Sequence, residues 1–519
     1  MKNFRTPLWI SLSIFFLTCQ KEDVLHQNDP IPNAESVITT EPEFPPGDLM
    51  VLGPPLENPY SLENMKKALK SLRKSSRAEL PGDYEVKTTH YYVKFLPENE
   101  AHLSLLSLDE GLILYDYPLD RKIKKLGNYY TDPNAPKDKP MPLYASVEVD
   151  DELPQSVPYE ILSHLHLPND YGDYEFIESN QRRLSNFIES LVDESLRLTG
   201  NWEDVVTPSE NARSRKWTPS GTVKTYDSSE GSNIPVEGLK VRARRWFTTH
   251  TGMTNSSGYY RCDGSFRRPA NYSLKFERHD FQIRTSTWLF NSAGVNGPKI
   301  ERSWNPIFLS TKPESYYATI FRAAHHYYYQ YVYGLHRPPQ NSIWKTQLKL
   351  KAFFKRPAGS FGADGSFSGF PLRGFGLYSP VQIYDSSRPS EDIYATTIHE
   401  LAHAAHWCQG WFVFNNSEVK VKESWARGVE WFLTKTVYDG YVPSYSIGSS
   451  TGVVQDMIDT IKDEPLSTIN ESVSGYTISQ IEKAMIGKKK WSEWRDNIKA
   501  KYNNSTENHL DALFDSWNL

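Results

Sequence analysis

The spacing of apolar residues changes along the chain, and this change divides it into regions of different predicted structure. In the first region, residues 56–205, a helical spacing occurs at 62–72 and again at 180–198. Residues 89–95 and 112–115 instead have the β-branched and aromatic composition of strands. We therefore predict an N-terminal α+β domain. It contains no catalytic motif, and both structural support and a pro-segment are open as its role.

The second region, residues 216–290, alternates apolar and polar residues. The pattern predicts strands at 221–227, 239–244 and 272–276, with a turn at 254–260. Short alternating strands joined by turns are typical of a small β-sandwich. A group of arginines in this region is expected on a solvated face: Arg242, Arg244, Arg245, Arg267 and Arg268.

Three short motifs carry a resemblance for this second region. They are Gly-Thr-Val at 221–223, a Pro-Val-x-Gly-x-x-Val run at 235–241, and Thr-Asn-x-x-Gly-x-Tyr at 254–260. In this order they are similar to the carboxypeptidase regulatory-like β-sandwich. The resemblance implies a small accessory module.

The third region, residues 305–519, returns to mixed spacing. An aromatic-rich helix is predicted at 316–334, followed by a strand at 345–354 and an edge-strand candidate at 380–385. Between the two strands, residues 359–376 contain six glycines, which predicts a mobile loop. Helical spacing then recurs at 451–463, 477–486, 490–503 and 507–517. The fold class we expect is a multidomain α+β chain that ends in a mixed sheet with a helical subdomain.

Candidate chemistry is concentrated in one helix of this third region. Pro389 and the acidic residues after it predict a helix start, and Gly410 predicts its end. Within these limits His399, Glu400 and His403 form an H-E-x-x-H motif, which composition alone would supply roughly 0.05 times in a chain of this kind. Residues four apart share a helix face, so both imidazoles can bind one metal ion. Glu400 is then the expected general base toward a water that zinc activates.

A zinc site of this type needs a third protein ligand. The metzincin pattern is excluded because His406 stands at its glycine position and Gln409 at its last histidine position. His406 is expected to be either a packed helix residue or a support for the metal ligands. Apolar residues at 425–432 recur at helical spacing, which places Glu423 and Glu430 on one further helix. Glu423 is the predicted third ligand of Zn²⁺. Glu430 is expected to hydrogen-bond a ligand or a substrate amine, or to form a surface ion pair.

These motifs resemble those of the gluzincin peptidases, the superfamily of thermolysin-like and M1-aminopeptidase-like enzymes. The nineteen residues between His403 and Glu423 are similar to the thermolysin spacing, and the E-x6-E pair is similar to the aminopeptidase helix. The resemblance covers roughly residue 305 to the end. Arg427 departs from it, because thermolysin-like enzymes place there an aspartate that supports a histidine ligand.

The gluzincin resemblance implies a zinc metallopeptidase that acts on proteins or peptides, as an endopeptidase or an aminopeptidase. It also implies that the edge strand lines the cleft, with the glycine-rich loop at its rim as substrate cover or as a linker. A Tyr or His donor is expected near the attacked carbonyl. Tyr476, which lies 53 residues beyond Glu423 at a predicted helix start, is the candidate. Tyr438, Tyr441 and Tyr445 are the next.

The N-terminus predicts export and a lipid anchor. Residues 1–18 combine two basic residues with a short apolar run, as a signal peptide does. Cys19 follows directly and resembles the lipidated cysteine of a bacterial lipobox, and the residues after it are similar to export signals on surface lipoproteins of Bacteroidota. Residues 19–55 are proline-rich and predict an extended tether. The expected location is the bacterial outer membrane, with secretion as the alternative.

Composition limits the remaining possibilities. With 58 basic and 63 acidic residues the chain has a net charge of −5, so nucleic acid is not an expected partner. Besides Cys19, two cysteines remain, Cys262 and Cys408, which allow one disulfide or two free thiols. The rival function is that of a catalytically inactive surface adhesin or nutrient-binding lipoprotein that uses the peptidase fold as a scaffold.

Overall fold

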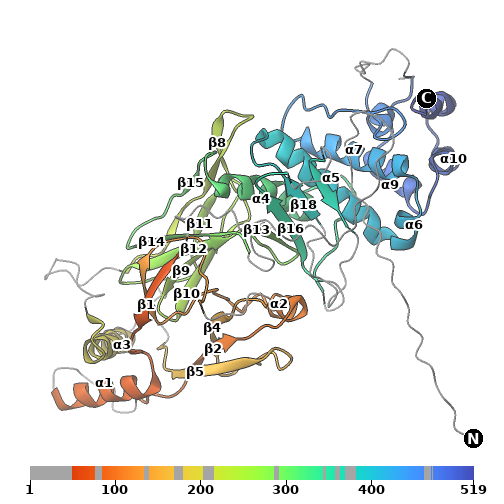
Figure 1. Cartoon of the computed structure of the whole chain (residues 1–519). Coiled ribbons are helices and arrows are strands. Elements are labelled where there is room, and N and C mark those ends of the chain that lie inside the picture. Colours follow the sequence, from red (N-terminus) through yellow and green to blue (C-terminus); the bar gives the residue numbers. More distant parts are fainter. Residues whose placement is uncertain are drawn as a thin grey trace, which may run out of the picture.

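The computed structural model describes residues 49–75, 84–133, 139–168, 179–202, 216–285, 292–342, 346–356, 363–368, 381–460, 469 and 472–518. The predicted signal peptide, Cys19 and most of the tether lie outside these residues. The described chain is a mixed α/β protein built from several small sheets and helices. Figure 1 shows the N-terminal elements at one end, β-strands in the middle and the C-terminal helices at the other end.

The N-terminal part contains an antiparallel sheet of order β4-β2-β5, a pair β1-β3, and three helices. Helices α1 and α3 pack through an apolar cluster that includes Met65 and Leu191, as the helical spacing predicts. The predicted strand at 112–115 is wrong, because only Tyr115 makes an isolated bridge there. The bounds are β1 Val51–Pro55, α1 Leu62–Ser75, β2 His90–Phe95, α2 Glu100–Leu106, β3 Arg121–Lys125, β4 Leu143–Glu148, β5 Tyr159–Leu165 and α3 Ser179–Leu198.

The middle part forms a sheet of order β10-β9-β12-β14, a sheet of order β15-β7-β8 and a pair β11-β6. The predicted strands at 221–227, 239–244 and 272–276 correspond to β6 with β7, to β9 and to β12, and the remaining strands were not predicted. The bounds are β6 Ser220–Thr222, β7 Lys224–Asp227, β8 Ser232–Pro235, β9 Lys240–Arg245, β10 Thr248–Met253, β11 Tyr259–Arg261, β12 Ala270–Lys275, β13 Phe281–Thr285, β14 Gly294–Ile300 and β15 Ile307–Phe308. Cys262 and Cys408 are not joined by a disulfide.

The C-terminal part begins with α4 and contains a sheet of order β13-β16-β18-β17. The first three strands are parallel and β17 is antiparallel. The bounds are α4 Pro313–Tyr329, β16 Leu348–Phe353, β17 Gly365–Phe367, β18 Val381–Tyr384, α5 Ser390–Gln409, α6 Trp411–Asn415, α7 Val419–Thr434, α8 Val453–Ile458, α9 Ile478–Met485, α10 Trp491–Lys501, η2 Glu507–His509 and α11 Leu510–Ser516.

Two features of this sheet differ from the sequence-based expectation. The segment 380–385 is not an edge strand: β18 lies between β16 and β17, and the edge is β17, which comes from the glycine-rich segment predicted as a loop. Strand pairing also crosses the predicted domain limits, because β13 joins the C-terminal sheet while β15 pairs with β7 of the middle part. Pairing of strands distant in sequence is decided by shared burial, which local spacing does not encode.

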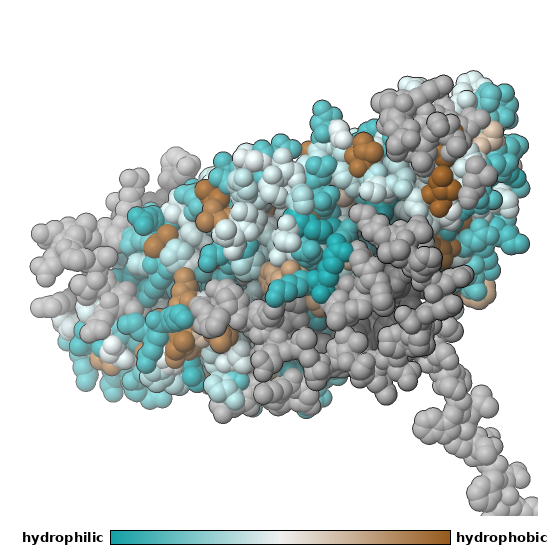
Figure 2. All heavy atoms as spheres, turned by 45° about the horizontal axis from the view of Figure 1, so that its top comes forward, coloured by the Kyte–Doolittle hydropathy of each residue, from teal (hydrophilic) through white to brown (hydrophobic). Residues whose placement is uncertain are grey.

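One continuous apolar core joins the middle and C-terminal parts, from Val223 on the first sheet to Trp517 in the last turn. The surface differs from this apolar core. On the face drawn in Figure 2, hydrophobic residues are scattered among hydrophilic ones. Among the described helices we find none with the length and apolar composition needed to cross a membrane.

The N-terminal part docks on the middle sheet through buried arginines of β9. Arg242 donates to the carbonyl of Leu114 at 2.8 Å and pairs with Glu277, and Arg244 donates to the carbonyl of Leu119. The expectation of a solvated arginine face is therefore wrong for Arg242, Arg244 and Arg245, which are all buried. Their alternation on the strand reflects a polar docking surface, because the partner segment offers carbonyls and tyrosine rings rather than apolar side chains.

A second buried contact ties α2 to the C-terminal sheet. Glu100, at the first residue of α2, lies 2.7 Å from Arg284 of β13 and 3.7 Å from Lys349 of β16. All three side chains are less than a tenth exposed. Burial lowers the pKa of Lys349 to about 7, although Glu100 acts in the opposite direction. Two cations in one buried site need this carboxylate.

We predict that Glu100→Ala lowers the free energy of unfolding by about 3 kcal/mol, because it removes the carboxylate that pairs with the buried Arg284 and Lys349. The measurement is urea unfolding followed by tryptophan fluorescence. The control is Glu160→Ala, whose carboxylate is paired on the surface with Lys94 and is 54% exposed. Its expected effect is within about 0.5 kcal/mol. Equal effects of the two substitutions would contradict the assignment.

Candidate metal centre

Helix α5 positions the H-E-x-x-H motif in the interior of the C-terminal part. It begins after the extended residue Pro389, carries acidic residues in its first turn and ends at Gly410, as the sequence predicts. Its surface is buried from Thr397 to His406, since α4, α7 and β18 pack around it. A helix enclosed on several sides holds its side chains in fixed rotamers, so the two histidines are held rigidly in place.

The three predicted ligands converge on one point. The Nε2 atoms of His399 and His403 lie 3.2 Å apart, and the Oε2 atom of Glu423 lies 3.3 Å from the first and 3.4 Å from the second. Glu423 comes from α7, which packs directly against α5. Among the described residues, this is the one group of three or more His, Cys, Asp or Glu side chains that meets the geometry of a metal site.

The spacing of these three atoms fits a tetrahedral zinc ion. Zinc bonds of about 2.0–2.1 Å place tetrahedral ligand atoms roughly 3.3 Å apart, close to the 3.2–3.4 Å observed. Two imidazole nitrogens that face each other at 3.2 Å share at most one proton. A cation placed among the three atoms would instead accept a lone pair from each. The donor set, two imidazoles and one carboxylate, is also one that zinc prefers.

Glu430 fixes the orientation of His399. Its Oε2 accepts a hydrogen bond from Nδ1 of His399 at 2.8 Å, which directs Nε2 of that ring toward the other ligands. Arg427 donates to both carboxylate oxygens at 2.8 and 2.7 Å, and the Tyr441 hydroxyl donates to Oε1 at 2.5 Å. Of the roles considered for Glu430, the hydrogen bond to a ligand is the one found. The surface ion pair is excluded, because Glu430 is 3% exposed.

The charges of this cluster follow from burial and from the partners of each group. Burial opposes ionisation of His399, but its hydrogen bonds to Glu423 and Glu430 raise its pKa to about 9. Burial also opposes the ionisation of Glu430, but the Arg427 guanidinium outweighs this effect and lowers the pKa of Glu430 to about 2. The pKa of Glu423 is held well below its usual value, since the two histidines outweigh its burial. Both carboxylates are therefore anionic and ready for a cation.

Glu400 lies on the same helix but outside the ligand set. Its Oε2 is buried and has no hydrogen-bond partner among the described residues, and burial raises its pKa to about 8. Strand β17 covers it closely: a methyl group at Gly365 would lie 2.8 Å from Oε1 of Glu400. The edge strand therefore approaches the motif only because residue 365 is glycine. Ser366 and Tyr384 hydrogen-bond each other at 2.9 Å on the adjoining strands.

Two further candidate residues, Tyr476 and His406, are not among the three converging ligands. The Tyr476 hydroxyl is buried without a hydrogen-bond partner among the described residues, and its neighbouring charge is Glu507, so the structure does not bring it into the ligand cluster. His406 packs edge-on against Phe414, with ring centroids 5.0 Å apart. Burial lowers its pKa to about 3, so it is a neutral packed residue.

Of the predicted residues, the structure therefore brings together His399, His403, Glu423 and Glu400. Sequence reasoning missed that Arg427 and Tyr441 both bind Glu430. The departure of Arg427 from the thermolysin pattern was a usable signal, because a buried arginine requires an acidic partner and Glu430 is the acid one turn further along the helix. Comparisons of the chain with protein-family models, with curated proteins and with solved structures gave no match.

We predict that Glu430→Gln weakens metal binding about 10–100-fold, because the amide is a poorer acceptor for the His399 ring and leaves Arg427 without its anion. Zinc affinity measured by competition with a chromophoric chelator tests this. Asp392→Asn, an exposed change in the first turn of α5, is the control and should bind zinc like the parent. Unchanged zinc affinity in Glu430→Gln would exclude the positioning role.

Proposed function

We propose that the chain is a zinc-dependent metallopeptidase of gluzincin type. The observation that carries the proposal is the triangle of His399, His403 and Glu423, whose ligand atoms lie 3.2–3.4 Å apart around a point that suits a tetrahedral ion. The mixed sheet with a helical C-terminal subdomain, and an H-E-x-x-H helix packed against a helix with the glutamate, agree with the gluzincin arrangement that the motifs resemble.

Each residue of the site has a separate role in the proposed reaction. Zinc, when bound, supplies Lewis acidity and lowers the pKa of water to about 7. Glu400 would accept a proton at its Oε2, which has no hydrogen-bond partner among the described residues, and later return it to the leaving amine. His399, His403 and Glu423 hold the ion, and Glu430 keeps the His399 ring in the tautomer that presents Nε2.

Strand β17 supports a peptide as the substrate. It pairs with β18 on one side, and the described residues supply no partner for its other side. A strand edge that lacks a partner binds an extended peptide through main-chain hydrogen bonds, and the side chains of β17 itself are buried. Because Gly365 on this strand lies against Glu400, a peptide held at the edge would pass close to the general base.

The arrangement favours structural support over a pro-segment as the role of the N-terminal part. Figure 1 places α1, α3 and the β4-β2-β5 sheet at the opposite end of the molecule from α5 and α7. A pro-segment that inhibits has to cover the cleft. This part instead binds the middle sheet through Arg242 and Arg244.

The rival function, an inactive adhesin or nutrient-binding lipoprotein, would need none of the charged groups between α5 and α7. Burying Glu400 without a hydrogen-bond partner costs about 1–3 kcal/mol, which a binding scaffold has no reason to retain. A carboxyl kept at this cost beside three converging metal ligands favours catalysis.

We predict that Glu400→Gln retains zinc and lowers peptide hydrolysis by at least about a hundredfold, since the site keeps its ligands and loses its base. The matched variant Glu423→Ala is expected to lose zinc itself, because it removes a ligand. Metal analysis and hydrolysis of a mixed peptide library by both proteins and the parent provide the measurement. Parental turnover in Glu400→Gln would refute the mechanism.

The sequence also leads us to propose an outer-membrane lipoprotein anchored through Cys19. Cys19→Ala should move the protein from the membrane fraction to the soluble fraction after cell fractionation, because a signal peptide without a lipidated cysteine leaves no anchor. Cys262→Ala, a change at a buried thiol of the middle part, is the control for general effects of cysteine loss. An unchanged membrane fraction of Cys19→Ala would indicate another attachment.

A further inference from the structure

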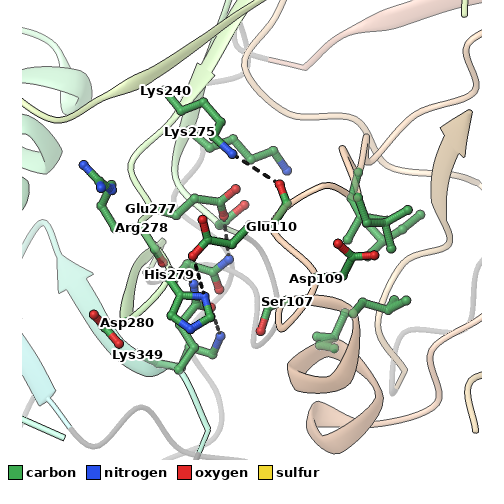
Figure 3. A pocket seen from close by; sticks show the side chains of 18 of the residues that line it. Ser107, Asp109, Glu110, Lys240, Lys275, Glu277, Arg278, His279, Asp280 and Lys349 are labelled. Atoms are coloured by element: carbon green, nitrogen blue, oxygen red, sulfur yellow. Dashed lines mark hydrogen bonds and ion pairs between the residues drawn. The ribbon is translucent and has the colours of Figure 1, made fainter. Parts of the chain in front are cut away.

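A cavity of about 390 Å³ lies between the N-terminal part and the middle and C-terminal sheets, away from the metal centre. Its volume is within the range of about 300–1,000 Å³ typical of small-molecule sites. Figure 3 shows side chains from β9, β12 and the following loop on one side, and the segment after α2 on the other. The cavity is thus enclosed by the two parts that the buried arginines hold together.

The two walls of the cavity differ in character. The wall from the N-terminal part has apolar side chains, Leu103 and Leu106 of α2, Leu112, Leu114, Met141 and Leu143, beside the acidic residues Asp109, Glu110 and Asp116. The opposite wall is charged, with Lys240, Arg242, Lys275, Glu277, Arg284 and Lys349. Apolar side chains that face a charged wall suit a ligand that has an apolar body and one polar end.

Two lysines of the charged wall stand directly opposite each other. Strands β9 and β12 pair with Leu274 opposite Val241, and one further step in this antiparallel register places Lys275 opposite Lys240. Like charges at directly opposite positions destabilise a sheet unless an anion lies between them. Figure 3 shows both side chains reaching into the same part of the cavity.

The acidic residues that line the cavity have partners within the protein, some of them in the cavity wall itself. Glu277 pairs with Arg242 at 3.1 Å, Glu110 pairs with His279 at 3.1 Å, and Asp109 accepts a hydrogen bond from the Gly111 amide at 2.9 Å.

The two lysines have longer contacts than these acidic residues. Asp116 is 3.4 Å from the Lys275 ammonium. The Lys240 ammonium has one long contact, 3.5 Å to the Glu110 carbonyl, and no ion pair within the described residues. The lysine pair therefore retains the capacity to bind one more anionic group.

We propose that this cavity is a binding site for a small amphipathic carboxylate, with the carboxylate between Lys240 and Lys275 and the apolar body against the leucines of α2 and the segment after it. A free fatty acid and the C-terminal end of an apolar peptide share this chemistry. The proposal does not depend on the peptidase activity, since no metal ligand lines the cavity.

The test is isothermal titration calorimetry of the full chain with two probes, decanoate and N-acetyl-leucyl-leucine. A chelator is present in every titration, so that a carboxylate cannot bind through zinc. Saturable binding of either probe supports the site, and the probe that binds identifies the source as a lipid or a peptide. If neither probe binds, the proposal is wrong.

Further titrations test separately whether binding depends on charge and whether it depends on the shape of the cavity. Decanol, or the C-terminal amide of the peptide, should bind at least about tenfold more weakly, as should the parent probe to Lys240→Gln/Lys275→Gln. Leu112→Trp fills the apolar side and should abolish binding while keeping both lysines. Lys66→Gln, at an exposed position of α1, is the control and should bind like the parent. Equal affinity for the neutral and charged probes would overturn the proposal.

Discussion

The packing of α5 against α7 is the interaction on which the candidate centre depends. It places five ionisable side chains, His399, His403, Glu423, Arg427 and Glu430, in an interior from which water is largely removed. Unpaired charges in such a place would cost several kilocalories per mole each. Each group therefore has a charged or hydrogen-bonding partner, and the geometry that satisfies them is also the geometry that presents three ligand atoms to one ion.

His399 is supported by a carboxylate that is itself paired with an arginine. Glu430 accepts a hydrogen bond from the His399 ring, and Arg427 neutralises and orients Glu430. The pair together supplies a rigid acceptor for the ring.

The junction with the N-terminal part combines apolar and polar contacts. An aromatic cluster joins Tyr60 and Tyr92 to Phe247. Arg242, Arg244 and the Glu100 cluster add buried polar contacts to it. Polar contacts fix relative orientation closely, because each donor needs a particular acceptor. They also leave space where side chains do not interdigitate, and the cavity lined by Lys240 and Lys275 lies at this junction.

The sequence by itself determined what depends on local spacing. The limits of α5, the shared helix of Glu423 and Glu430, and the strands of the middle part follow from periodicity and from proline and glycine signals, which act within a few residues. The convergence of His399 and His403 followed from the helical repeat, because these residues share a face of any helix that contains them. The tertiary structure decided the rest. It made β17 the edge strand and β18 an inner one, buried the arginines of β9, and placed the Tyr476 hydroxyl in a buried position near Glu507. These outcomes depend on which distant segments pack together, and a pairing across a hundred residues is selected by shape and burial rather than by local pattern.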